Sequence, residues 1–139
     1  MKVVIDSRRA YEDACREGAE PLLDRRFDIE HSLRVEIQRE LFGKGHTTAE
    51  NERFYRWVWS RKMHICENCI KRLSEYSATY VSHILARGAY PEMAHDPRNV
   101  NILCFDCHSQ WENGNREAMR IYESNQITIA ELKKEYSCI

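Results

Sequence analysis

The sequence lacks any apolar run of the roughly 18 to 20 residues that a membrane-spanning helix needs. It also lacks the apolar core of a signal peptide, because charge returns within residues 1 to 6. Internal repeats and low-complexity tracts are absent as well. These absences argue against a membrane association and predict a protein that stays in the cytoplasm.

The chain also has no excess of either charge. Its 21 Lys and Arg residues and 22 Asp and Glu residues give a net charge of −1, so bulk electrostatics do not indicate a nucleic-acid-binding protein. The 139 residues, 42% hydrophobic and 31% charged, are typical of one compact soluble domain. Cations gather between residues 53 and 72, and this patch either contacts phosphates or forms an ordinary solvated helix face. Within it, Arg61 and Lys62 are candidates for nucleic-acid contacts.

Two helices are predicted in the first half of the chain. The first covers residues 29 to 42, carries the apolar stripe Leu33, Ile37 and Leu41, and ends at the glycines of residues 43 to 45. The second opens with a capping-box pattern over residues 47 to 50 and runs to about residue 62. One side of it carries four residues that we interpret as core packing: Phe54, Trp57, Val58 and Arg61.

The second half predicts shorter elements. Residues 78 to 85 are expected to be extended, and a helix is expected to start near Asp106. Asn115 is a candidate cap for a further helix over residues 116 to 122. A second capping-box pattern over residues 128 to 131 predicts the start of a short C-terminal helix.

Six cysteines are many for a chain of this length, and four of them form two Cys-x-x-Cys pairs. The pairs are Cys66 with Cys69 and Cys104 with Cys107, whereas Cys15 and Cys138 stand alone. Two residues between thiolates let both sulfurs of a turn reach one ion at about 2.3 Å, and two such turns complete a tetrahedron. A closed tetrahedron leaves no position for a substrate, so the sequence predicts a structural Zn²⁺.

Three alternatives remain for these residues. The cysteines could be buried without a ligand, or His64 could replace one of them at the zinc. The third alternative is a redox protein that uses a Cys-x-x-Cys pair, although two pairs followed by a histidine fit a metal site better.

Polar residues between and after the cysteine pairs form an ordered set. In chain order the set is Ser82-His83, then Asn99 five residues before Cys104, then Cys107-His108 and Glu112. This order resembles the motif of the HNH endonucleases, in the four-cysteine zinc subtype of phages and bacteria. The resemblance covers about residues 64 to 114.

The resemblance implies an α+β fold with a ββα-metal, treble-clef-like core over residues 64–114. A helical extension over residues 1–63 would precede the core, and helices over residues 115–139 would follow it. The implied activity is hydrolysis of phosphodiester bonds in DNA, which leaves a 5′ phosphate and a 3′ hydroxyl. Such an enzyme acts in a bacterium or a phage-infected cell, as a monomer that nicks one strand or as a homodimer that cuts two.

Within the motif, the resemblance implies that His83 is the general base and that Asn99 fixes the loop and orients it, with His108 completing the catalytic set. Imidazole suits a general base because its unperturbed pKa lies near neutral pH. An amide side chain offers both a donor and an acceptor for holding a loop. Arg87 is a candidate phosphate clamp. The alternatives are that His83 is an ordinary structural histidine and that Asn99 is a turn residue.

The spacing of His108 and Glu112 itself points to a bound cation. Residues four apart on a predicted helix project from one face and can hold one divalent ion, with Mg²⁺ or Mn²⁺ expected. The ion would act as a Lewis acid on a phosphate. His108 could instead be a spare zinc ligand, and Glu112 could be a solvated helix residue.

One residue departs from the family pattern. Many HNH endonucleases carry Asp or His just before the base histidine, as a ligand of the catalytic ion, whereas this chain has Ser82. A neutral hydroxyl is a poor ligand, so Ser82 would hold the ion weakly, yield its place to water or leave a site that no longer cuts. The alternative function is therefore a non-catalytic zinc-knuckle module that binds nucleic acid or a protein partner.

Overall fold

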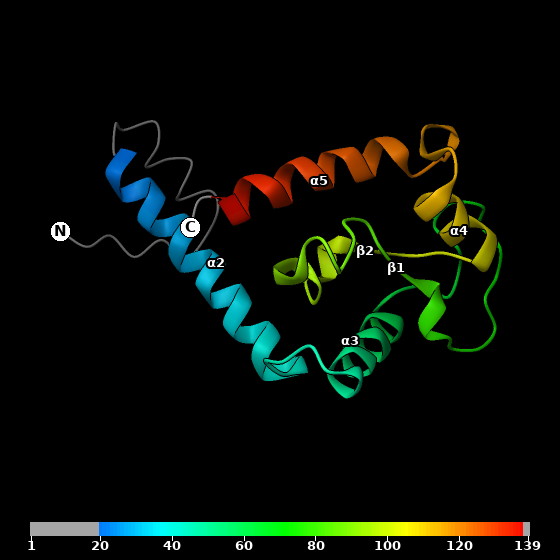
Figure 1. Ribbon diagram of the computed structural model, residues 1–139, viewed down its shortest axis with the longest axis horizontal. Coiled ribbons are helices and arrows are strands. Elements are labelled where there is room, and N and C mark those ends of the chain that lie inside the picture. Colours follow the sequence, from blue (N-terminus) through cyan, green and yellow to red (C-terminus); the bar gives the residue numbers. More distant parts are fainter. Residues whose placement is uncertain (1–19, 138–139) are drawn as a thin grey trace.

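The computed structural model describes the backbone of residues 20–137 and the side chains of residues 30–137. Cys15, Cys138 and the opening segment 1–6 lie outside the described residues. Helices and one small antiparallel sheet alternate along the chain, so the protein is a mixed α and β structure (Figure 1). The elements are α2 (Glu20–Phe42), α3 (Thr48–Arg61), η1 (Ala78–Tyr80), β1 (Val81–His83), η2 (Pro91–Met93), η3 (Pro97–Asn99), β2 (Val100–Ile102), α4 (Phe105–Asn113), η4 (Arg116–Ala118) and α5 (Tyr122–Ser137). Among residues 20–137, no helix is both long and apolar enough to cross a bilayer.

The boundary between the first two helices is confirmed. Helix α2 ends at Phe42 because Gly43 has a φ of +108°, and a Cβ at that residue would collide with the Glu50 carboxylate. Helix α3 opens with the expected capping box, in which the Thr47 hydroxyl accepts from the Glu50 N–H at 3.2 Å. The Glu50 carboxylate in turn accepts from the Gly45 N–H at 3.0 Å and therefore ties the whole turn together.

The two predicted apolar faces differ in burial. On α3, Phe54 and Val58 are fully buried and Trp57 packs partly buried against the core, as the packing interpretation requires. Arg61 is exposed, so the interpretation was wrong for that residue. On α2, the stripe of Leu33, Ile37 and Leu41 is 52%, 53% and 44% exposed. The helical spacing therefore predicted the helix correctly. The predicted apolar stripe, however, is not the face of α2 that packs against the described part of the chain.

A C-terminal helix is present as expected, but its predicted start and the separate helix over residues 116 to 122 were wrong. Helix α5 starts at Tyr122, and Thr128 lies inside it, where the Thr128 hydroxyl donates to the Ser124 carbonyl at 3.1 Å. Asn115 precedes only the three-residue turn η4 and makes no side-chain capping bond. The helix extends back past Thr128 because Asn125 is buried against Asn101, with amide-to-amide bonds of 2.8 and 3.2 Å.

The segment predicted to be extended is only partly so. It opens with the turn η1, and only Val81–His83 forms strand β1. Strand β1 pairs antiparallel with β2 in the register Val81–Ile102, Ser82–Asn101 and His83–Val100. The main core lies between α3, these strands and α4, and Trp111 of α4 is its largest fully buried side chain.

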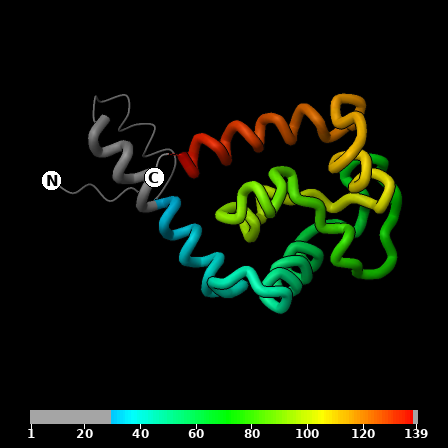
Figure 2. The backbone as a smooth tube through the Cα atoms, in the orientation of Figure 1, coloured from blue at the N-terminus to red at the C-terminus, as the bar shows by residue number. Residues whose placement is uncertain are grey.

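Helices α2 and α5 form two outer arms, the C-terminal end of α5 approaches the middle of α2, and the turns η2 and η3 lie between them in this view (Figure 2). A group of polar and charged side chains joins these parts, and we call it the polar clamp: His31, Asp96, Arg98, Glu135 and Tyr136. Arg98 donates to Asp96 at 2.6 Å and to Glu135 at 2.7 Å, and the Tyr136 hydroxyl donates to Asp96 at 2.9 Å. The clamp fixes the segment 94–99, which matters below because that segment contacts His83.

Candidate functional site

The first cysteine pair lies in a tight knuckle. The Cys66 N–H donates to the Lys71 carbonyl at 2.8 Å, and the Ile70 N–H donates back to the Cys66 carbonyl at 3.0 Å. Ile70 adopts a positive φ of 68°, which lets the chain reverse directly after Cys69. The second pair lies at the start of α4, with Cys104 as the residue before the helix and Cys107 in its first turn.

The four sulfurs converge on one point. All of them lie within 4.8 Å of one another, and the Sγ atoms of Cys69 and Cys104 are 3.7 Å apart. Sulfurs about 2.3 Å from a central ion in a tetrahedron are themselves about 3.8 Å apart, so the arrangement fits a zinc ion. It is also the sole cluster of this kind among the side chains of residues 30–137. The predicted metal-binding group is therefore present as a set.

Backbone donors favour the ionised form at one of these sulfurs. Burial raises the pKa of the Cys66 thiol, but N–H groups of Cys69, Cys104 and Asn68 outweigh it and lower that pKa to about 7. The Asn68 amide also donates to the Cys107 sulfur at 3.3 Å and accepts from the Arg120 N–H at 2.7 Å. Asn68 therefore orients a ligand from outside the cluster, a role that the sequence motif did not reveal.

His64 is not a member of the cluster. Its ring stacks on the indole of Trp59 with the centroids 3.7 Å apart, and one ring nitrogen lies 3.0 Å from the Trp59 carbonyl. The four cysteines form the group without it.

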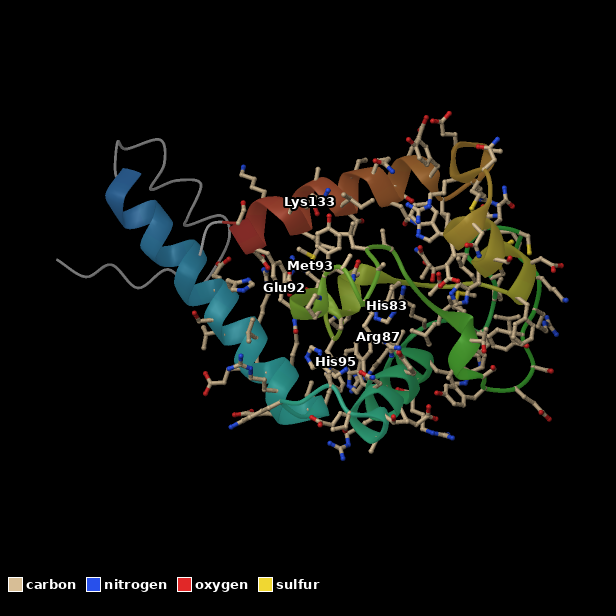
Figure 3. All side chains as sticks on the ribbon, viewed as in Figure 1. His83, Arg87, Glu92, Met93, His95 and Lys133 are labelled. Carbon is tan, nitrogen blue, oxygen red and sulfur yellow. The ribbon has the colours of Figure 1, made fainter. Side chains whose placement is uncertain are left out.

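A second feature is an open cleft of about 690 Å³ beside β1 and α4. Four residues nominated from the sequence line it: His83, Arg87, His108 and Glu112. Figure 3 shows His83 and Arg87 near each other at the centre of the molecule. The structure therefore brings together nominated residues that are up to 29 positions apart in the chain, the separation of His83 and Glu112.

The orientation of His83 is fixed by a backbone carbonyl. Its Nε2 lies 2.8 Å from the Ala94 oxygen, and because a carbonyl can only accept, Nε2 must carry the proton. In the neutral ring the lone pair is then on Nδ1. Burial lowers the pKa of His83 below its ordinary value, so the ring is neutral at pH 7.

Asn99 holds the loop that supplies this carbonyl. It is fully buried, its amide donates to the carbonyls of Leu85 and Met93 at 3.0 and 3.2 Å, and its oxygen accepts from the Leu85 N–H at 2.8 Å. Because Ala94 directly follows Met93, Asn99 controls the position of the group that orients His83.

His108 and Glu112 face each other one helical turn apart. The His108 Nδ1 donates to the Thr79 carbonyl at 2.6 Å, which leaves the lone pair of a neutral ring on Nε2. That Nε2 lies 2.9 Å from a Glu112 carboxylate oxygen. Two acceptors at this distance need a proton or a cation between them, and a carbonyl on the other nitrogen is the usual support of a metal-binding histidine.

Three nominated residues lie elsewhere. Ser82 points to the face of β1 opposite His83, is 1% exposed, and its hydroxyl has no hydrogen-bond partner, so it does not reach the cleft. The Lys62 ammonium contacts Glu67 at 3.3 Å and the Val100 carbonyl at 3.1 Å. Arg61 lies over the ring of Trp57 at 5.1 Å.

Sequence reasoning missed two residues that line the cleft, Tyr55 and Arg116. Tyr55 accepts from Arg87 at 2.7 Å, and its ring contacts that of His83 with the centroids 6.1 Å apart. It also missed His95, which is 3% exposed and bonds to Asn51 at 2.7 Å. Burial, with nearby His46 and His83, lowers the pKa of His95 to about 4. No local pattern marks Tyr55 or His95, because their partners Arg87 and Asn51 are distant in the chain, whereas Arg116 contacts Trp111 only five residues earlier.

Comparisons of the chain with protein-family models, with curated proteins and with solved structures found no match.

Proposed function

We propose that the protein is a metal-dependent endonuclease of the HNH type, which hydrolyses phosphodiester bonds in DNA with His83 as the general base. The observation that carries this proposal is the shared cleft. A histidine with a fixed lone pair and a histidine–carboxylate pair line the same open space.

His83 would take a proton from the attacking water through Nδ1. The Ala94 carbonyl keeps the proton on Nε2, so the ring presents its basic atom without having to change tautomer. Because burial lowers its pKa, the ring is unprotonated at neutral pH and free to act as a base. Asn99 acts as a positioning residue, since it fixes the loop that carries Ala94.

His108 and Glu112 would hold a divalent cation such as Mg²⁺ or Mn²⁺. When bound, such an ion supplies Lewis-acid stabilisation of charge on the phosphate and the leaving 3′ oxygen. Arg87 would clamp a phosphate oxygen, since its guanidinium is exposed and is steadied by the Tyr55 hydroxyl. The metal of the four cysteines would be structural: it would take no part in the reaction and would only hold the knuckle against α4.

The second candidate is a zinc-knuckle module that binds nucleic acid or a protein without cutting. One observation favours it: Ser82 is turned away from the cleft, so His108 and Glu112 are the two evident cation ligands in the described part of the chain. A cation held by two protein ligands needs water and substrate oxygens to supply the rest of its coordination shell.

The two candidates separate in a plasmid assay with zinc-loaded protein and added Mg²⁺ or Mn²⁺. We expect nicked or linear DNA with 5′ phosphate ends, and a loss of about 10²- to 10⁴-fold in rate for His83→Ala. Arg120→Ala is the matched surface control and should cut normally. Cutting that is undiminished in His83→Ala would remove His83 from the mechanism, and DNA binding without cutting would favour the module.

The same assay reports on the base and on the assembly. Because burial lowers the pKa of His83, the rate should fall at a lower pH than it would with an exposed histidine as the base. Linear product formed in one step would indicate a homodimer that cuts both strands, whereas nicked product alone would indicate a monomer.

A further inference from the structure

The cleft carries a second arginine that the motif does not include. Arg116 belongs to the turn η4, directly beyond α4, and lines the same space as His83 and Arg87. It is exposed, and within residues 30–137 its guanidinium pairs with no carboxylate. Arg98, by contrast, is bonded to both Asp96 and Glu135. An unneutralised arginine in a cleft is a candidate ligand for an anion.

Arg116 is held in place although it has no ionic partner. Its guanidinium lies over the ring of Trp111 at 4.5 Å, and its Nε donates to the Trp111 carbonyl. The Trp111 indole is 1% exposed and donates to the carbonyl of Ile84, the residue after His83, at 3.1 Å. Arg116 is therefore tied to the strand of the proposed base through one rigid aromatic ring.

The turn that brings Arg116 back over Trp111 depends on Gly114. A Cβ on Gly114 would lie 3.1 Å from both the Cα and the carbonyl oxygen of Gln110, which are backbone atoms that cannot easily move. The glycine lets the chain leave α4 sharply and return along it. With Nε used by the protein, the two terminal nitrogens of Arg116 remain for a ligand of the cleft that this residue lines.

The charged side chains of the cleft are mostly positive. The charged side chains that line it are Arg87, Glu112 and Arg116, so cations outnumber the single carboxylate. Arg87 and Arg116 come from different elements, one after β1 and one after α4. A cation at Glu112 would raise the positive charge further, and a phosphodiester chain is the ligand whose charge is spread over repeated oxygens.

We propose that Arg116 is a phosphate-binding residue of the cleft, which grips a DNA phosphate with its terminal nitrogens while Trp111 holds the guanidinium flat. This inference rests on the proposed function and names a contact that the motif does not supply. Because a phosphate contact carries no sequence information, Arg116 should strengthen binding to all duplexes alike. It should also contribute one counterion to the salt dependence.

The test is DNA binding by zinc-loaded protein in a His83→Ala background, so that no cutting intervenes. Fluorescence anisotropy with a short labelled duplex is measured over a range of salt concentrations. Arg116→Ala should weaken binding about tenfold and lower the slope of log affinity against log salt by about 1. Arg116→Lys keeps the charge but loses the planar fork, so it should retain the slope and lose several-fold in affinity. Arg120→Ala, another exposed arginine beyond α4, is the control.

The outcomes separate the two proposals. If Arg116→Ala retains the affinity and slope of Arg120→Ala while the parent binds duplex, this inference is overturned and the proposed function stands. If the parent binds no duplex at any salt concentration, both fall. A slope that falls in Arg116→Ala but not in Arg116→Lys supports the phosphate contact, because a merely structural role of the turn would not depend on charge.

Discussion

The four-cysteine cluster and the His83 cleft are both built on α4, yet they differ in every property that matters for chemistry. The cysteine sulfurs lie within 4.8 Å of one another and are mostly buried, so the cluster is closed around one point. The cleft is open, and its His108–Glu112 pair is directed at a space rather than at further ligands. A closed set of like ligands stabilises a fold, whereas an open set of unlike groups can admit a substrate.

Removing one sulfur of the cysteine cluster should have the largest effect on stability. Cys66→Ser should abolish cooperative unfolding at room temperature, because binding of a structural zinc is itself folding free energy, on the order of 10 kcal/mol. Circular dichroism during denaturant titration would show this, and strong chelators should have the same effect on the wild-type protein. Cys15→Ser, outside the two pairs, is the matched control. A Cys66→Ser protein with full zinc content and normal stability would contradict the structural role.

Asn99 tests how the cleft depends on its supporting loop. Asn99→Ala leaves the Leu85 N–H and the Leu85 carbonyl without partners and removes one of the two bonds to the Met93 carbonyl, which still accepts from the Asp96 N–H, so we expect a loss of about 3 kcal/mol in unfolding free energy. Cutting should fall as well, because the Ala94 carbonyl would no longer be fixed. Asn115→Ala, which removes no side-chain capping bond, should change stability by less than about 0.5 kcal/mol. Equal stabilities of the two variants would show that Asn99 is a replaceable turn residue.

His95 gives a smaller effect that depends on pH. Its pKa is about 4 when folded, below its ordinary value of 6.5, so the unfolded chain binds the proton more readily. The folded state should therefore lose stability as the pH falls from 6.5 toward 4, by up to about 3 kcal/mol from this group. His95→Gln should lose this component in urea unfolding measured at each pH. Protonation of the cysteines affects the wild type and His95→Gln alike. If the unfolding free energies of these two proteins changed with pH in parallel, His95 would not be a buried neutral group.

Ser82→Ala should have the smallest effect, because this residue lies outside both the cysteine cluster and the cleft. The hydroxyl is buried without a partner, so its removal should leave stability unchanged or raise it by up to about 1 kcal/mol. Cutting and metal affinity should not change, because Ser82 does not line the cleft. A clear drop in metal-dependent cutting would mean that Ser82 turns toward the ion when substrate binds.

Features set by neighbouring residues could be predicted from the sequence. The Thr47 capping box, the end of α2 at Gly43 and the start of α4 before His108 depend on contacts within one or two turns. The cysteine cluster was also predictable, since the two-residue spacing within each pair fixes half of the tetrahedron.

Features set by distant segments could not be predicted in this way. The pattern at Thr128 has the form of a helix start, but the helix continues because Asn125 pairs with Asn101. Leu33 and Ile37 have helical spacing, but periodicity does not say which face of a helix is covered. Tyr55 and His95 obtain their roles from Arg87 and Asn51, which no spacing rule connects to them.

The proposed nuclease needs a divalent cation that His108 and Glu112 hold in the cleft beside His83, apart from the cysteine metal. The most direct measurement is an electron paramagnetic resonance titration of Mn²⁺ into zinc-loaded protein, with His108→Ala alongside the wild type. We expect one Mn²⁺ to bind per wild-type chain without loss of zinc, and this binding to be lost in His108→Ala. Equal Mn²⁺ binding by the two proteins, or none by the wild type even with DNA present, would contradict the account.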